Sequence, residues 1–195
     1  MRTFVVAAVV AAGLLAGCAG SDFVRPDTEV LKNGQTTVAQ VVQRLGAPRT
    51  KGSVVKNGKT LTSYSYAYAS TMGSPVRSGV IPARSLTAYF DGEMLVGHEF
   101  VSSWAEDATE FDETKAPSLV KGTTTRADVT RLLGKPAGAY VPPMAKPPAV
   151  DALVYAYVQT ARDGLGVKFF RKVLVVSFDA RGVVTDVDFE SSGNK

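Results

Sequence analysis

Cysteine and histidine are the side chains best suited to covalent or metal chemistry, and the chain has one of each, Cys18 and His98. A thiolate can attack an acyl donor or bind a metal, but these two residues cannot fill a tetrahedral zinc site. No Gly-x-Ser-x-Gly elbow and no Gly-x-x-x-x-Gly-Lys phosphate loop occurs. The sequence therefore predicts no metal site, no cofactor, no small-molecule substrate and no enzymatic activity, with His98 a surface or half-buried strand residue.

Cys18 lies directly after a segment with the layout of a secretory signal. Arg2 supplies a positive start, an uncharged apolar stretch runs from Phe4 to Leu15, and two small residues precede the cysteine. That stretch is too short to span a bilayer, which needs about 20 apolar residues. Residues 15–18, Leu-Ala-Gly-Cys, resemble the lipobox of bacterial lipoproteins, which implies cleavage before Cys18 and acylation of that residue.

An acylated cysteine would tether the mature chain to a membrane, because several acyl chains bind a bilayer stably where one chain binds marginally. Ala19 follows the cysteine, where lipoproteins retained in the inner membrane typically carry aspartate. The resemblance thus implies a protein that is anchored in the outer membrane and faces the periplasm. The alternative is a simple secretory peptide cut near Gly20, with Cys18 discarded.

The remainder of the chain excludes one class of partner. It has no further cysteine, so noncovalent packing must hold the fold despite export to a compartment that permits disulfides. The formal net charge of the full chain is +4, which falls to +3 with the loss of Arg2, and lysine and arginine are scattered instead of forming runs. This pattern argues against a nucleic-acid partner.

An internal repeat organises the mature chain. Residues 31–48 align without a gap on residues 119–136, at an offset of 88 residues, and half of the aligned positions are identical. The same offset relates a later set of positions, in which Leu86, Phe90 and Asp91 match Leu174, Phe178 and Asp179. We interpret the chain as a duplicated unit.

Each unit begins with a predicted helix whose ends are marked by residue type. In the first copy, Thr36 or Thr37 can cap the free N–H groups, and valine and leucine then recur at helical spacing. A Leu-Gly-x-Pro sequence ends the helix in both copies. We expect Gly46 and Gly134 to adopt positive φ there, and Pro48 prevents continuation.

Alternating β-rich segments predict three strands after each helix. They cover residues 63–68, 86–90 and 94–101 in the first unit and 153–159, 173–178 and 183–190 in the second. The predicted fold class is α+β, with two tandem repeats, each a helix packed on a three-stranded antiparallel sheet. The predicted divisions are a signal peptide at 1–17, a tether at 18–30, repeats at 31–103 and 119–195, and an acidic linker at 104–118.

The repeated motif resembles a known family. Residues 34–48 and 122–136 both fit Gly-x-Thr-Thr-x-x-x-Val-x-x-x-Leu-Gly-x-Pro, and each is followed by a Tyr-x-Tyr strand and a Phe-Asp hairpin. This pattern resembles the small protein A/OmlA (BamE-like) outer-membrane lipoproteins, and its tandem copies resemble the β-lactamase inhibitor protein. The resemblance covers nearly all of the mature chain and implies helices on a three-stranded antiparallel sheet. The duplication departs from the family's single-copy subunit of an assembly machine.

Tyrosines are the candidate binding residues. Tyr64, Tyr66 and Tyr68 share one face of a predicted strand, and Tyr155 and Tyr157 repeat the pattern. If the helices cover the opposite face, the five tyrosines form an open surface, which suits partner binding because tyrosine offers large area and a polar tip. If the helices cover the tyrosine face, the five are core. Both alternatives stay open at this point.

Two connecting segments have other assignments. The acidic residues of 104–118 indicate a solvated linker, in which Trp104 and Phe111 could still pin the two halves together. The stretches 73–79 and 141–148 are rich in glycine or proline and are the next candidates for binding if the tyrosines prove to be core.

Three classes of function remain. The main hypothesis is a noncatalytic, lipid-anchored periplasmic scaffold that binds an envelope protein, for example an outer-membrane β-barrel or its assembly machinery. The second is an inhibitor that covers an enzyme with a concave sheet. The third is an envelope enzyme with unrecognised chemistry. Fold analogy alone cannot choose among the partners.

Overall fold

The computed structural model describes residues 22–27, 29–164 and 166–194. The predicted signal peptide and Cys18 lie outside the described residues. No helix among those described is long and apolar enough to cross a membrane. The elements are α1 (Val38–Leu45), β1 (Thr50–Lys56), β2 (Lys59–Ala69), β3 (Ala83–Asp91), β4 (Met94–Ser102), the 3-10 helix η2 (Glu113–Ser118), α2 (Arg126–Leu133), β5 (Gly138–Tyr140), β6 (Asp151–Asp163), β7 (Gly166–Phe178) and β8 (Val184–Gly193).

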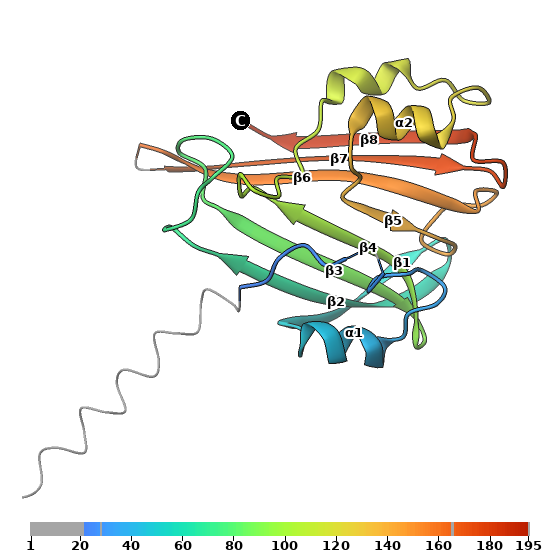
Figure 1. The fold of residues 1–195 in the computed structure, drawn as a ribbon, viewed down its shortest axis with the longest axis horizontal. Helices are drawn as coiled ribbons and strands as arrows, with labels where there is room; N and C mark the ends of the chain where they lie inside the picture. Colours follow the sequence, from blue (N-terminus) through green and yellow to red (C-terminus); the bar gives the residue numbers. More distant parts are fainter. Residues whose placement is uncertain (1–21, 28, 165, 195) are drawn as a thin grey trace, which may run out of the picture.

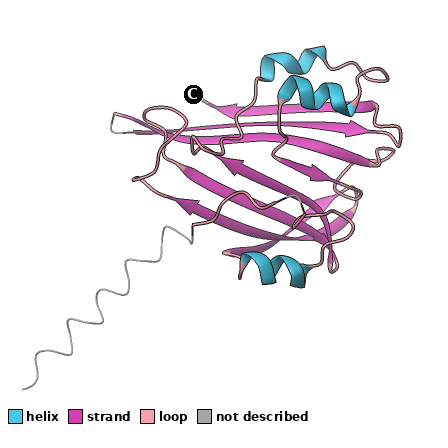
Figure 2. Ribbon diagram, in the orientation of Figure 1, coloured by secondary structure: helices cyan, strands magenta, loops and turns pink. Residues whose placement is uncertain are grey.

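All the strands form one antiparallel sheet in sequential order from β1 to β8 (Figure 1). The sheet curls into a half-barrel and the helices are few and short, so the protein is mostly β (Figure 2). The predicted fold class of two repeats on separate three-stranded sheets is therefore wrong. The physical reason is β5, which pairs with β4 through Gly97 and Tyr140 and with β6 through Gly138 and Val154. The unpaired backbone groups of a free β4 edge are satisfied in this way, and the two halves become one sheet.

The prediction missed β1 and β5, the first strand of each repeat. Their first residues, Thr50 and Gly138, lie at the repeat offset. The side chains of β1 are exposed except at the partly buried Val54, so this edge strand lacks the alternating pattern that marks a half-buried strand. One signal for β1 was present in the sequence. Asn57 and Gly58 form the turn to β2 at φ 48° and 79°, the positive values that make Asn-Gly a typical hairpin turn.

The helix boundaries follow from local chemistry in both repeats. Thr37 caps α1 and Thr125 caps α2, each in a reciprocal pair with the side chain of the third helical residue. Gly46 and Gly134 end the helices at φ 80°, which confirms the predicted positive φ. Their ψ values of −171° and −155° place them in a region of backbone space that is open essentially to glycine alone.

Substituting valine for Gly46 or Gly134 should therefore lower the free energy of unfolding by about 1–3 kcal/mol. The cause is backbone strain and not crowding, because a Cβ at either position would meet no atom within 4 Å. Urea denaturation measures the loss. Ala47→Val at the neighbouring exposed position is the matched control, and an equal loss there would contradict the strain argument.

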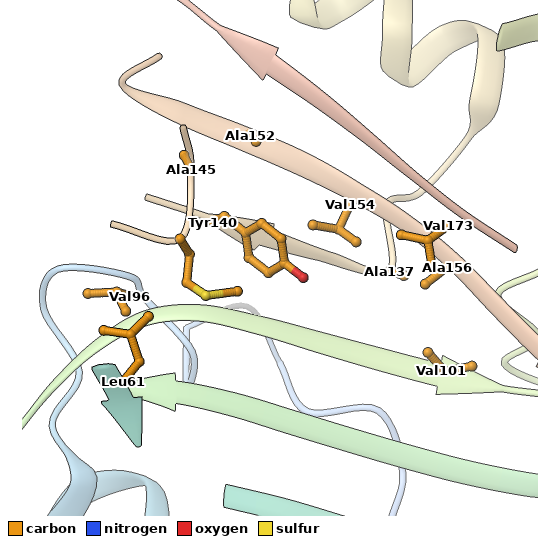
Figure 3. Packing of buried hydrophobic residues seen from close by; sticks show 11 residues of the cluster. Leu61, Val96, Val101, Ala137, Tyr140, Ala145, Ala152, Val154, Ala156 and Val173 are labelled. Carbon is orange, nitrogen blue, oxygen red and sulfur yellow. The ribbon is translucent and has the colours of Figure 1, made fainter. Parts of the chain in front are cut away.

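The two faces of the sheet carry separate cores. On the convex face, one cluster lies under α1 and includes Val41 and Phe90, and another lies under α2 and includes Val129 and Phe178. On the concave face, a single cluster joins strands as distant as β2 and β7. Figure 3 shows this third cluster, with Tyr140 among side chains of β4 and β6.

The segment between β5 and β6 closes part of the concave face. Met144 and Ala145 are buried in the concave cluster, and the Asn57 amide donates to the Pro143 carbonyl at 2.8 Å. The segment thus packs from β5 across to the β1–β2 turn. Residues 143–145 of the reserve binding candidate 141–148 therefore belong to the packing of the half-barrel, while Pro142 and residues 146–148 are exposed.

Candidate functional site

The structure places four of the five candidate tyrosines in the core of the convex face. Tyr155 and Tyr157 are 1% and 0% exposed, and Tyr64 and Tyr66 are buried as well. Tyr68 is partly exposed and stacks on Trp104, with ring centroids 6.0 Å apart. The alternative in which helices and connecting segments cover the tyrosine face is the one observed, so this stripe is not an open surface.

Two of the tyrosines hold the helices onto the sheet. The Tyr66 hydroxyl donates to the Gly46 carbonyl, and the Tyr155 hydroxyl donates to the Gly134 carbonyl, both at 3.1 Å. A carbonyl at a helix C-terminus has no partner within the helix, so each bond satisfies a group that would otherwise need one. Burial raises the pKa of Tyr155 to about 12, which keeps its donor proton in place. Tyr66 and Tyr155 thus have a structural role, since each binds the C-terminal end of a helix to the sheet.

The acidic connector is docked on the second repeat by a buried cation. Lys172 is 1% exposed, and its Nζ bonds to the Phe111 carbonyl and to the Glu113 carboxylate. The same ammonium lies 4.5 Å from the centre of the Phe111 ring. Since a buried charge is stable only when it is paired, the carboxylate of Glu113 has a structural role. The segment 104–118 is thus packed on the sheet here and is not simply solvated.

A second buried cation gathers the start of the described chain and the connector. Arg84 is 3% exposed and lies within 3.0 Å of the Asp22 carboxylate and 2.9 Å of the Asp107 carboxylate, and it also pairs with Glu106. Its guanidinium stacks over the Trp104 ring at 4.5 Å. The N-terminal segment is therefore held against the sheet from residue 22, within the predicted tether of 18–30.

The concave face carries a polar centre that sequence reasoning missed. Glu99 on β4 accepts a hydrogen bond from the Tyr89 hydroxyl at 3.4 Å and another from the Tyr140 hydroxyl. Burial raises the pKa of Glu99, and the positive charge of Arg171 on β7 acts in the opposite direction. Two tyrosine donors and a nearby guanidinium thus surround one carboxylate inside the half-barrel. No motif signals such a set, because its members come from four strands.

Small side chains form the floor of the concave face beside this centre. Ser63 and Ser65 on β2 and Thr87 on β3 are partly exposed, and no helix covers them. Towards the ends of these strands a cavity of about 430 Å³ opens, lined in part by Ala67 and Val158. Among the described residues no group of three or more His, Cys, Asp or Glu side chains could hold a metal ion. The floor thus presents hydroxyl groups and small apolar side chains to solvent.

His98 lies on the convex face, in a cavity of about 470 Å³ between the N-terminal segment and the second repeat. Its Nδ1 is 3.4 Å from the Asn33 amide oxygen. Burial, with a smaller contribution from the charge of Arg25, lowers the pKa of His98 from 6.5 to about 4. The imidazole is therefore neutral at neutral pH.

His98 should make the fold sensitive to acid. Its pKa is lower in the folded than in the unfolded state, so the unfolded chain binds more protons and stability is lost as the pH falls from 6.5 towards 4. The loss is expected to reach about 3 kcal/mol at most. His98→Gln should flatten the pH dependence of urea denaturation in this interval. The raised pKa of Glu99 acts in the opposite sense, so a Glu99→Gln variant is the companion measurement, and an unchanged slope in His98→Gln would contradict the assignment.

No protein-family model matches the sequence, and no curated protein matches it significantly. The resemblance to the BamE-like lipoproteins therefore stays a prediction. Among solved structures, the fold is similar to a proposed beta-lactamase inhibitor protein from Streptococcus mutans. The two chains are 12% identical over 84% of this chain and 91% of that chain, with a TM-score of 0.40. This is a distant similarity of fold alone.

Proposed function

We propose that the protein is a noncatalytic scaffold, lipid-anchored through Cys18 in the outer membrane and facing the periplasm, which binds an envelope protein on its concave face. The anchor is supported by the Leu-Ala-Gly-Cys sequence at 15–18 after a short apolar segment. The binding surface is supported by the geometry of the half-barrel. Because the tyrosine stripe on the convex face is buried, we place the binding surface on the concave face instead.

The uncovered floor around Ser65 and Thr87, next to Glu99, is the observation that carries the binding proposal. Small side chains let a partner backbone approach the sheet closely. The hydroxyls and the Glu99 carboxylate supply hydrogen bonds that fix its orientation, and the partly buried Val158 adds apolar contact. A protruding loop or extended segment of a folded partner fits a concave surface of this kind.

The same surface would serve an inhibitor if the partner is an enzyme whose active-site rim enters the half-barrel. The concave shape favours this second candidate, and the identity of the partner separates it from the scaffold. In both cases the contacts are made by the same side chains of β2, β3, β4 and β6.

Site-specific photocrosslinking in intact cells tests the proposal. A photoreactive amino acid replaces Ser65 or Thr87 in the full chain, and Gln43 on the exposed side of α1 is the matched control. We expect one envelope protein to be crosslinked from Ser65 and Thr87 and not from Gln43. A captured enzyme would select the inhibitor, and a captured barrel or assembly protein would select the scaffold. Equal crosslinking from all positions would overturn the concave face as the binding site.

A further inference from the structure

The N-terminal segment leaves little free chain between the described fold and Cys18. The Asp22 carboxylate accepts from Arg84 at 3.0 Å, and the Phe23 carbonyl accepts from the same guanidinium at 3.2 Å. The Phe23 ring meets Phe100 edge-on at 6.2 Å. Four residue steps of at most about 3.6 Å each connect Asp22 to Cys18, so the anchor lies within about 14 Å of Asp22. Whatever holds Cys18 must therefore lie close to the start of β3.

Two other segments lie at the end of the sheet where β3 begins. The β2–β3 loop, residues 70–82, and the β6–β7 hairpin, residues 161–164 and 166–169, lie side by side there, on the left in Figure 1. The Ile81 amide donates to Thr160 at 2.8 Å and the Arg162 amide donates to Gly79 at 3.0 Å, which joins the loop to the hairpin. We call this end, made by the loop, the hairpin and the first described residues, the proximal end.

Apolar side chains are exposed at the proximal end. Met72 is 95% exposed in the loop, and Val167 and Phe169 are 67% and 51% exposed on the hairpin. Val24, near the start of the described chain, is 70% exposed. Half of the large hydrophobic side chains that are exposed among the described residues thus belong to this one end. Exposed apolar side chains gathered in this way mark an interaction surface.

Basic side chains alternate with these apolar ones on the hairpin. Arg162 and Lys168 flank Val167 and Phe169, and Asp163 is the one acidic residue between positions 160 and 171. Arg171 lies further along β7, where it faces Glu99 and pairs with Glu190. The acidic residues of the neighbouring connector are already engaged, since Glu106 pairs with Arg84 and Glu110 pairs with Arg77. The hairpin therefore presents a net positive charge together with apolar tips.

We propose that the proximal end rests on the phospholipid surface that holds Cys18, with Met72, Val167 and Phe169 inserted at the level of the headgroups. This inference rests on the proposed lipid anchor and adds the orientation of the protein to it. Apolar tips combined with basic side chains fit a bilayer containing anionic lipid, because the tips enter the boundary of the acyl region and the cations meet the headgroups. The end of the half-barrel that carries the β2–β3 loop and the β6–β7 hairpin then contacts the membrane, and the concave face points sideways, neither towards the membrane nor away from it.

The orientation places the opposite end of the sheet farthest from the bilayer. That end contains the turn at Asn57 and Gly58 and the turn at Asp91 and Gly92. Val55, close to the first of these turns, is 68% exposed and gives a matched reporter position. A partner would reach the concave face from the side, without crossing the lipid headgroups.

Depth-dependent quenching in vesicles tests the orientation. With Cys18 acylated as proposed, Met72→Cys and Val55→Cys each introduce a sole free thiol for an environment-sensitive fluorophore. The labelled proteins are reconstituted in vesicles of phosphatidylethanolamine and phosphatidylglycerol that contain spin-labelled lipid. We expect the probe at position 72 to be quenched at least about twofold more than the probe at position 55.

The outcomes separate the orientation from the anchor. A chain that fails to float with the vesicles overturns both the lipid anchor and this inference. A chain that floats but shows equal quenching at the two positions overturns the orientation alone. Adding Phe169→Ser to the Met72→Cys chain should reduce the quenching at position 72, and a thermal melt of this exposed variant checks that the fold is intact. A proximal end that crosslinks to a protein in cells and shows no lipid quenching would belong to a protein partner and would also overturn the inference.

Discussion

Tyr155→Ala is expected to lower the free energy of unfolding by about 3–5 kcal/mol. The side chain is 1% exposed and its ring lies 5.8 Å from the Phe111 ring, within the core under α2. Truncation removes this packing, leaves a cavity and strips the Gly134 carbonyl of its donor. Urea denaturation followed by circular dichroism measures the change.

Two further variants make this result specific. Tyr155→Phe keeps the ring and removes the hydroxyl, so it should cost about 1 kcal/mol for the lost hydrogen bond. Tyr68→Ala removes a ring that is partly exposed and stacked on Trp104, so its cost should be well below that of Tyr155→Ala. Equal losses for Tyr68→Ala and Tyr155→Ala would contradict the difference in burial.

The ends of the helices could be predicted because they depend on neighbours in the sequence. Thr37 and Gln40 lie within one helical turn and satisfy each other's backbone groups. Gly46 ends α1 at a backbone conformation that other residues rarely adopt. The same logic held for the second copy, and the six predicted strands overlap β2, β3, β4, β6, β7 and β8, of which β2, β6 and β7 are longer than predicted. Each of these signals is complete within about ten residues.

The faces of the sheet could not be chosen from the sequence, because both sides of β6 are apolar. Val154 and Ala156 face the concave cluster, while Tyr155 lies under α2 and the Tyr157 ring lies 6.0 Å from the buried Lys172 ammonium. An alternating strand with two buried faces gives no preference for either. The joining of the two halves into a single sheet could not be predicted either. It depends on the short pairing of β5 with β4, between segments about 40 residues apart.

The polar centres of the molecule were also out of reach of sequence patterns. Arg84 and Lys172 occupy equivalent positions of β3 and β7, and their residue types alone would place them at the surface, yet both are buried and paired with the acidic connector. A useful signal was that each occupies the face that the strand otherwise gives to apolar residues. An inward-facing cation requires a carboxylate, and the connector between the repeats was the richest source of carboxylates.

Cys18→Ser should abolish lipid attachment almost completely, because a serine hydroxyl does not replace the thiolate as the nucleophile. The proposed anchor predicts that the variant either keeps its signal segment or is released from the membrane fraction. Metabolic labelling with a palmitate analogue, followed by membrane fractionation, measures both effects. Equal labelling of the variant and the parent chain would refute the lipid anchor.

A neighbouring substitution separates attachment from location. Ala19→Asp leaves the cysteine intact, so labelling should continue, while the resemblance to lipoprotein signals implies retention of the protein in the inner membrane. The structure makes the location matter, because only about 14 Å of chain separates Cys18 from the docked Asp22. A concave face held this close to one membrane can engage only partners at that membrane, so Ala19→Asp should also remove the crosslinks made from Ser65 and Thr87. Crosslinks that persist unchanged with the protein in the inner membrane would show that the partner is not confined to the outer membrane.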